Sequence, residues 1–90
     1  MSDAADESLL KFPTAFPIKV MGLTRDGFAQ AMSEIVLRHA PDFDAATTEM
    51  RSSREGKYLS LTFTINATSR QQLDGLYREL SSNPMVAMVL

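Results

Sequence analysis

The residues able to do acid–base, nucleophilic or metal chemistry are few and scattered in this 90-residue chain. His39 is the single histidine and cysteine is absent, so the chain cannot build a thiol nucleophile or a multi-histidine metal site. Asp42 and Asp44 flank Phe43 without the further carboxylates that a calcium loop needs. The sequence therefore predicts that the protein is not an enzyme and holds no metal or cofactor.

His39 has a structural interpretation. It follows Phe28 at helical spacing and precedes Pro41, which places it in the last turn of a predicted helix. A histidine there interacts favourably with the helix dipole and can satisfy terminal carbonyls. We interpret His39 as a helix-end residue.

One glycine-bearing loop has the residue types to bind a small anion. Gly22 and Gly27 bracket Arg25 and Asp26 between a predicted strand and a predicted helix, where backbone N–H groups can bind a carboxylate. Arg25 would supply the counter-charge. The same residue types are common where a helix simply begins, so ligand binding and plain helix initiation both remain open for this loop.

Charge and hydropathy exclude two classes of partner. The formal net charge is -2 and the pI is about 5.2, the wrong sign for a domain that binds phosphate backbones. The longest apolar run spans only 85–90, far below the ~20 residues of a membrane helix. Without cysteine and without a signal-peptide pattern, we expect a cytoplasmic protein that binds neither nucleic acid nor membrane.

Hydrophobic periodicity predicts six elements after a flexible acidic tail over 1–11, in one domain over 12–90. Because Pro17 cannot donate a backbone hydrogen bond, we expect regular strand pairing to start just after it. The elements are a strand over 16–22, a helix from the N-cap Thr24 to the boundary at Pro41, a strand over 46–52 and a turn over 53–56, a strand over 58–65, a helix capped by Thr68 or Ser69 and stopped by 81–84, and a strand over 85–90.

This β-α-β-β-α-β order predicts an α+β, ferredoxin-like fold. Right-handed crossovers would place both helices on one face of a four-stranded antiparallel sheet, with the first and third strands in the centre. The alternating apolar residues of the central strands and of both helices should form the core: Ile18, Val20, Leu59, Leu61, Phe63, Ile65, Phe28, Met32, Ile35, Leu73, Leu76 and Leu80.

The other face of the sheet should stay open, and the last strand should form an apolar edge beside it. Exposed apolar edge strands invite pairing with another chain. The open face and this edge are therefore the predicted interface, formed by Lys19, Met21, Tyr58, Ser60, Thr62, Met85, Ala87 and Val89 or their neighbours.

Several motifs, in this order and spacing, resemble the YbeD-like family of small bacterial proteins over about residues 9–90: the segment from Phe12-Pro13 to Met21-Gly22, Arg38-His39-Ala40-Pro41, Ile65-Asn66-Ala67-Thr68, Leu76-Tyr77-x-x-Leu80 and the ending Met88-Val89-Leu90. The resemblance implies a ferredoxin-like fold similar to ACT regulatory domains and implies no established activity. ACT domains often carry Asp-Pro-Gly and a large apolar residue in the first loop; here Asp26, Gly27 and Phe28 stand without the proline.

RNA-recognition modules share this strand order, but they stack bases on several aromatic residues of the open face. Tyr58 is the single outward aromatic on the third strand. We therefore expect a small non-enzymatic regulatory or adaptor protein, which associates with itself or with another protein. The alternative is an ACT-like sensor that binds an amino acid or related anion in the loop with Asp26 and Gly27.

Overall fold

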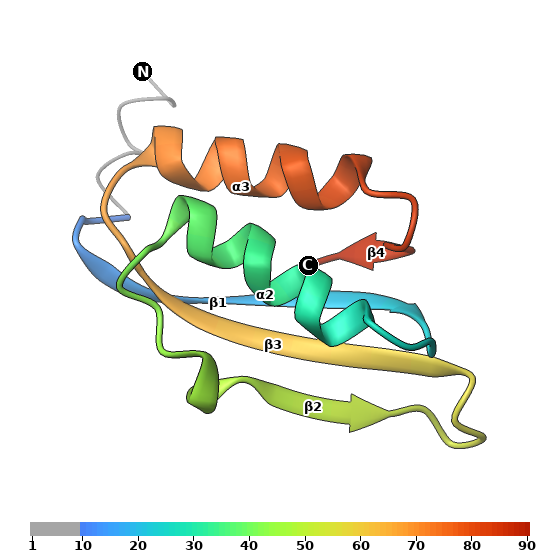
Figure 1. Ribbon diagram of the computed structural model, residues 1–90. Coiled ribbons are helices and arrows are strands. Elements are labelled where there is room, and N and C mark those ends of the chain that lie inside the picture. Colours follow the sequence, from blue (N-terminus) through green and yellow to red (C-terminus); the bar gives the residue numbers. More distant parts are fainter. Residues whose placement is uncertain (1–9) are drawn as a thin grey trace.

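The computed structural model describes residues 10–90. Its elements in chain order are β1 (Thr14–Leu23), α2 (Phe28–His39), the 3-10 helix η1 (Ala45–Thr47), β2 (Glu49–Ser52), β3 (Tyr58–Ala67), α3 (Arg70–Ser82) and β4 (Met88–Val89). Both α-helices lie on the same face of one sheet, which gives two layers (Figure 1). The predicted tail falls mostly on residues 1–9, outside the described residues, whereas Leu10 packs against the core.

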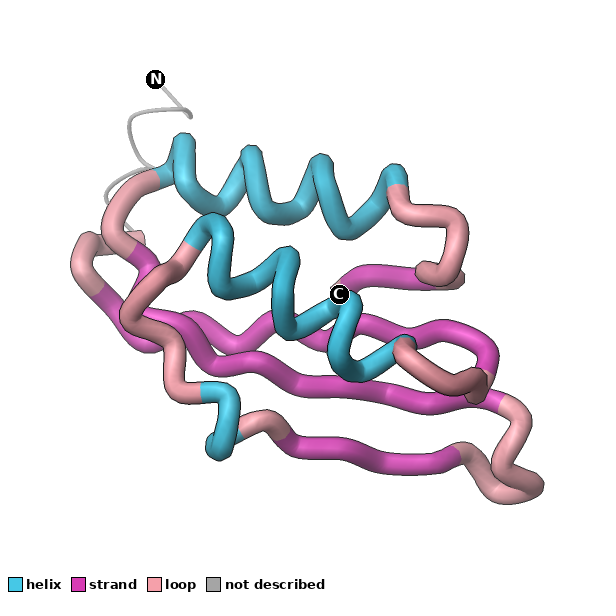
Figure 2. The backbone as a smooth tube through the Cα atoms, viewed as in Figure 1, coloured by secondary structure: helices cyan, strands magenta, loops and turns pink. Residues whose placement is uncertain are grey.

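The sheet has the order β2-β3-β1-β4, and every neighbouring pair is antiparallel. The central strands β1 and β3 run side by side over their whole lengths, and β2 and β4 form the two edges (Figure 2). Since β1 and β3 are separated by α2 and β2 in sequence, their pairing needs the crossover that this fold provides. The predicted ferredoxin-like architecture is confirmed.

The expectation that pairing starts after Pro17 is wrong, because β1 pairs with β3 from Thr14 onward. Lys19 exchanges both of its backbone hydrogen bonds with Leu90, on the β4 side. Pro17, two residues earlier, turns its nitrogen to that same side. The Pro17 nitrogen therefore faces away from β3, and its missing N–H costs no hydrogen bond with that strand.

Helix α2 ends as predicted and begins later than predicted. Ala40 leaves the helical region at φ -135°, as the following Pro41 requires. Thr24 does not cap the helix, because α2 starts only at Phe28, and the Thr24 N–H donates to the Lys57 carbonyl at 2.9 Å, which extends the β1–β3 ladder. Gly27 takes the N-cap position instead, in the left-handed region at φ 83°.

The second predicted strand is shorter than expected. The carboxylate of Asp44 accepts a hydrogen bond from the Ala46 N–H at 3.0 Å and winds Ala45–Thr47 into a 3-10 turn. Only Glu49–Ser52 then pairs with β3. The following turn ends with Gly56 at φ 75°, a conformation that glycine adopts without strain.

Helix α3 begins at the second of the two predicted capping boxes. The hydroxyl of Ser69 accepts the Gln72 N–H at 3.1 Å, and the Gln72 side-chain oxygen accepts the Thr68 N–H at 2.7 Å. The terminal strand is reduced to two residues, since Asn83 accepts the N–H groups of Met85 and Val86 in a turn that follows the helix.

The core lies between the helices and one face of the sheet. All twelve predicted core residues are buried, and Phe28, Phe63, Leu61 and Leu76 are among those fully removed from solvent. Burying one such side chain stabilises the fold by roughly 1.5–3 kcal/mol. Four further apolar residues complete the core: Val36, Ala40, Phe43 and Ala67.

Candidate functional site

Each central strand sends alternate side chains to opposite faces of the sheet. Ile18, Val20 and Leu61 are fully buried under the helices, whereas the residues between them, Lys19 and Thr62, lie on the face that carries no helix. Figure 1 shows both helices on the other side. We call the uncovered side the open face; because no described element packs on it, its side chains are available for contacts.

An apolar group occupies the part of the open face that lies over β1, β4 and the start of β3. Met88 is opposite Met21, Tyr58 is opposite Leu23, and Leu90 is hydrogen-bonded opposite Lys19. Cross-strand partners share a face, so these side chains stand together. Leu23, Met88 and Leu90 are 51%, 49% and 62% exposed. We define the apolar patch as Met21, Leu23, Tyr58, Met88 and Leu90.

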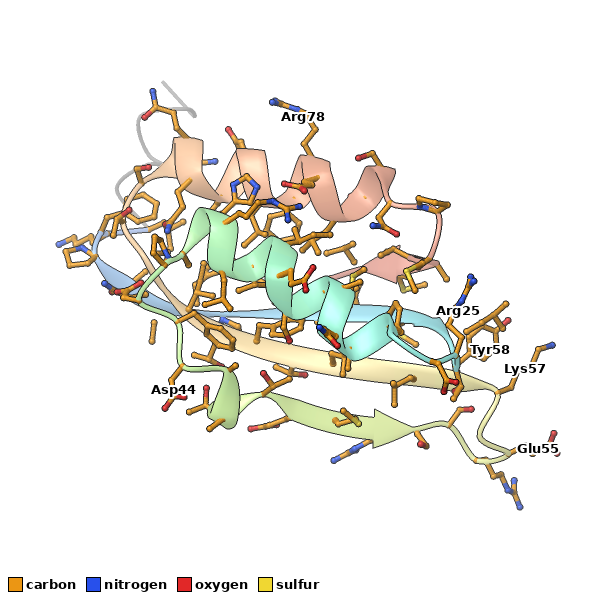
Figure 3. All side chains as sticks on the ribbon, in the orientation of Figure 1. Arg25, Asp44, Glu55, Lys57, Tyr58 and Arg78 are labelled. Carbon is orange, nitrogen blue, oxygen red and sulfur yellow. The ribbon has the colours of Figure 1, made fainter. Side chains whose placement is uncertain are left out.

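Tyr58 is the aromatic member of the apolar patch and lies at the end of the sheet. It projects there together with Lys57 and Arg25 (Figure 3). The Lys57 ammonium lies 5.7 Å from the centre of the Tyr58 ring, a cation–π distance. A basic fringe therefore borders the patch at this end.

The predicted interface residues divide into two groups. Lys19, Met21, Tyr58, Ser60 and Thr62 lie on the open face together. The predicted residues of the terminal segment do not lie on the open face. Val89 is opposite the buried Val20, and both Val89 and Met85 pack against the core. Ala87 is exposed and donates its N–H to the Met21 carbonyl at 2.7 Å. Their neighbours Met88 and Leu90 are the open-face residues.

A shallow polar depression of about 280 Å³ lies on the open face beside the apolar patch. Residues of opposite charge face each other across it, with Glu49 on β2 in register with Thr62 and Lys19, and Arg51 in register with Ser60. Its lining is completed by Met50. The open face thus has an apolar half over β1, β4 and the start of β3, and a charged half over β2 and the middle of β3 and β1.

The structure gives Gly22 of the predicted ligand loop a packing role. A Cβ atom at this position would lie 2.3 Å from the Met85 carbonyl oxygen and 2.7 Å from the Phe28 ring. Only glycine lets the terminal segment and the first turn of α2 approach β1 so closely. Gly22 is buried, so it offers no surface to a ligand.

Arg25, Asp26 and Gly27 form an exposed turn into α2. The Arg25 carbonyl accepts the Phe28 N–H and the Gly27 carbonyl accepts the Ala31 N–H, so these bonds start the helix. Gly27 has no side chain to cap the first turn, and that turn contains no acidic residue. Neither the depression on the open face nor a second one of about 260 Å³ beside Tyr77 is lined by these residues.

His39 joins the two helices. Its Nε2 lies 2.7 Å from a carboxylate oxygen of Glu79 on α3, and Arg38 forms an ion pair with the same carboxylate. The side chain of Gln72 adds a hydrogen bond to the His39 carbonyl at 2.9 Å. The sequence placed His39 in the last turn and expected its side chain to satisfy terminal carbonyls, but the imidazole bonds Glu79 instead. A partner forty positions away leaves no local signal.

Two side chains near the helix layer have shifted ionisation. Hydrogen bonds from His39 and then Arg38 lower the pKa of the Glu79 carboxyl below its ordinary value. Burial raises the pKa of the Tyr77 hydroxyl, whose ring meets Phe16 edge-on at 6.5 Å. Tyr77 lines the second depression together with Arg70 and Asp74, and its hydroxyl donates to the Leu90 carbonyl at 3.3 Å. Glu79 lines neither depression and serves to link the two helices.

The two loop aspartates act locally. Asp44 caps the 3-10 turn, and Asp42 accepts a hydrogen bond from the Asn66 side chain at 3.4 Å. Within the described part of the chain, no three acidic or histidine side chains gather as a metal site would need. The same residues contain no helix long and apolar enough to cross a membrane.

Comparison with known proteins gives relatives over nearly the whole chain. The chain is 56% identical to a UPF0250 protein of Bordetella pertussis over 85 residues, which is 94% of this chain and 93% of the relative. It is 58% identical to a UPF0250 protein of Nitrosomonas europaea, with 94% and 98% covered. Each match covers more than nine-tenths of both chains.

The solution structure of an H. pylori protein matches the fold with a TM-score of 0.72 at 16% identity, covering 90% of this chain and 85% of that one. This likeness concerns the fold alone. The model of a family described as "Protein of unknown function (DUF493)" matches residues 7–90. Because this family model and relatives that are 56% and 58% identical both match over nearly the whole chain, the chain belongs to the bacterial DUF493 or UPF0250 family, which is the YbeD-like family that its motifs resemble.

Proposed function

We propose that this is a small non-enzymatic regulatory or adaptor protein, which acts by binding another protein through the apolar patch and the adjoining edge of β4. One observation carries the proposal. Six large apolar side chains are exposed among residues 10–90, and four of them, Leu23, Tyr58, Met88 and Leu90, belong to this one patch. Scattered exposure is ordinary on protein surfaces, whereas a contiguous apolar group with a polar border is typical of interaction sites.

The chemistry of the patch suits a protein partner. Met21 and Met88 are flexible and polarisable, and Tyr58 combines a flat apolar ring with a polar hydroxyl; both residue types are common in protein interfaces. The charged half of the open face provides the polar rim, through Lys19, Glu49 and Arg51. We expect the partner to present an apolar segment to the patch and charged groups to the rim.

The test is site-specific photo-crosslinking in bacteria that produce the protein. A photoreactive residue replaces Met88, and a matched control carries it at Leu37, which is exposed on α2 outside the patch. The proposal expects discrete crosslinked species from position 88 and not from position 37. No product at position 88, or the same products from both positions, would contradict it. Leu23→Lys should remove the products without lowering thermal stability.

The second candidate is an anion sensor at the turn formed by Arg25, Asp26 and Gly27. It is supported by the first turn of α2, which has no side-chain cap and therefore keeps N–H groups available. A thermal-shift screen against amino acids and organic acids tests it. A ligand at ~100 times its dissociation constant adds about 2.7 kcal/mol, and Arg25→Ala should abolish that shift. If the shift survives Arg25→Ala, the ligand binds elsewhere.

A further inference from the structure

The outer edge of β2 is the longer of the two free sheet edges. β2 is the terminal strand in the order β2-β3-β1-β4, and Figure 2 shows it at the side of the sheet away from β4. All four of its residues are exposed, whereas the opposite edge strand β4 has only two residues. A free edge presents unpaired N–H and C=O groups that can pair with another strand.

The positions of these groups follow from the β2–β3 ladder. Ser53 donates its N–H to the Tyr58 carbonyl at 2.8 Å, and the register pairs Arg51 with Ser60 and Met50 with Leu61. In an antiparallel ladder, bonded and non-bonded pairs alternate. Arg51 therefore turns its backbone groups toward β3, and Met50 turns both of its backbone groups outward to the free edge.

The side chains of this edge are self-complementary around Met50. Glu49 precedes it and Arg51 follows it, and both lie on the open face, in register with Thr62 and Ser60. When a second β2 pairs antiparallel about a two-fold axis at Met50, each Glu49 lies opposite the Arg51 of the second copy. This is a non-hydrogen-bonded pair of the new ladder, the kind in which facing side chains are closest.

The other groups fit the same arrangement. Met50 would exchange N–H and C=O bonds with the Met50 of the second copy, and its side chain, 60% exposed, would pack against its equivalent. Ser52 would donate to the Thr48 carbonyl of the second copy. Thr48 is extended, and its own N–H is already used in a bond to Ala45 at 3.2 Å.

From this complementarity we infer that two copies of the chain pair β2 against β2 in a symmetric dimer, which joins their sheets into one of eight strands. The interface is isologous, so it closes at two copies and does not propagate into a filament. The dimer does not depend on the proposed function. The apolar patch lies over β1, β4 and the start of β3, so it stays free when β2 pairs with β2.

Charge reversal tests the pairing. Glu49→Arg places two pairs of arginines across the axis, and Arg51→Glu places two pairs of glutamates there. Each single variant should weaken dimerisation about tenfold or more, because two attractive pairs become repulsive at once. The double variant E49R/R51E restores both pairs and should dimerise like the wild type. A mixture of the two single variants should form the heterodimer in preference to either homodimer.

The measurement is sedimentation velocity from about 10 µM to about 1 mM, since small interfaces are often transient. The matched control is Met88→Glu on the opposite edge, which should leave the dimer unchanged. A wild type that stays monomeric over this range, a double variant that stays monomeric, or loss of the dimer in Met88→Glu would each overturn the inference. Thermal unfolding of every variant, expected to match the wild type, verifies that each remains folded.

Discussion

The two faces of the same two strands differ in what constrains their residues. On the covered face, Val20 and Phe63 are fully buried against the helices. On the open face, the intervening Met21 and Thr62 are partly exposed and contact no described element of the second layer. The covered face therefore determines the fold, and the open face can change its chemistry without changing the fold.

The largest expected effect comes from emptying the covered face. Phe63→Ala removes a fully buried ring that meets Phe43 edge-on at 5.7 Å, so it should lower the free energy of unfolding by about 3–5 kcal/mol. Its neighbour on the open face, Thr62→Ala, should change that free energy by about 0.5 kcal/mol or less. Urea unfolding of both variants compares the faces directly. Equal losses would remove the distinction between them.

The next test overfills the covered face. Gly22→Ala forces a methyl group against the Met85 carbonyl and the Phe28 ring, and should cost about 1–3 kcal/mol. Gly75→Ala is the matched control, because its new methyl group meets only the His39 ring, at 3.4 Å. Since Gly75 lies inside α3, alanine there should stabilise the protein by about 0.5–1 kcal/mol. Thermal unfolding should show a lower midpoint for Gly22→Ala and a higher midpoint for Gly75→Ala. An unchanged midpoint for Gly22→Ala would contradict the close approach of Met85 and Phe28 to β1.

A smaller effect is expected on the outer side of the helix layer. Because the folded-state pKa of Glu79 lies below its ordinary value of 4.5, its stabilisation is present at neutral pH and is lost as the pH falls through the folded-state pKa. Glu79→Gln should therefore be less stable than the wild type at pH 7, by about 1 kcal/mol or less for so exposed a pair, and the difference should shrink toward pH 3. Chemical unfolding at several pH values measures it; a constant difference would contradict the ion pair.

The smallest effect on stability should come from the apolar patch itself. Leu23→Lys replaces a side chain that is half exposed, so it should change the free energy of unfolding by about 0.5 kcal/mol or less, as measured by thermal unfolding. A large loss of stability would mean that Leu23 belongs to the folding core. The patch would then have to be redefined without it.

The sequence predicted those features whose signal is local and repeated. The alternation from Leu59 to Ile65 identified β3 and its buried face, and Pro41 located the end of α2. The start of α2 could not be found in the same way, because the N–H of Thr24 is bonded to the carbonyl of Lys57, in the turn that precedes β3. A competing long-range hydrogen bond leaves no trace in the local residue pattern.

The site was predictable only in part for the same reason. The pattern indicated the open face and the apolar terminal segment, but the register of β4, which places Met88 and Leu90 there, depends on pairing with β1. The self-complementary order of Glu49, Met50 and Arg51 could be read from the sequence. Its meaning depended on knowing that β2 is an edge and which of its backbone groups point outward.

The place of β1 between β3 and β4 has a consequence for folding kinetics. Both of its partners come much later in the sequence, whereas β2 and β3 are joined by a single short turn. The β2–β3 hairpin can close rapidly, but the insertion of β1 closes long loops and must be slow. Destabilising substitutions in β1 should therefore slow folding more than those in β2, because the pairing of β1 is the rate-limiting step.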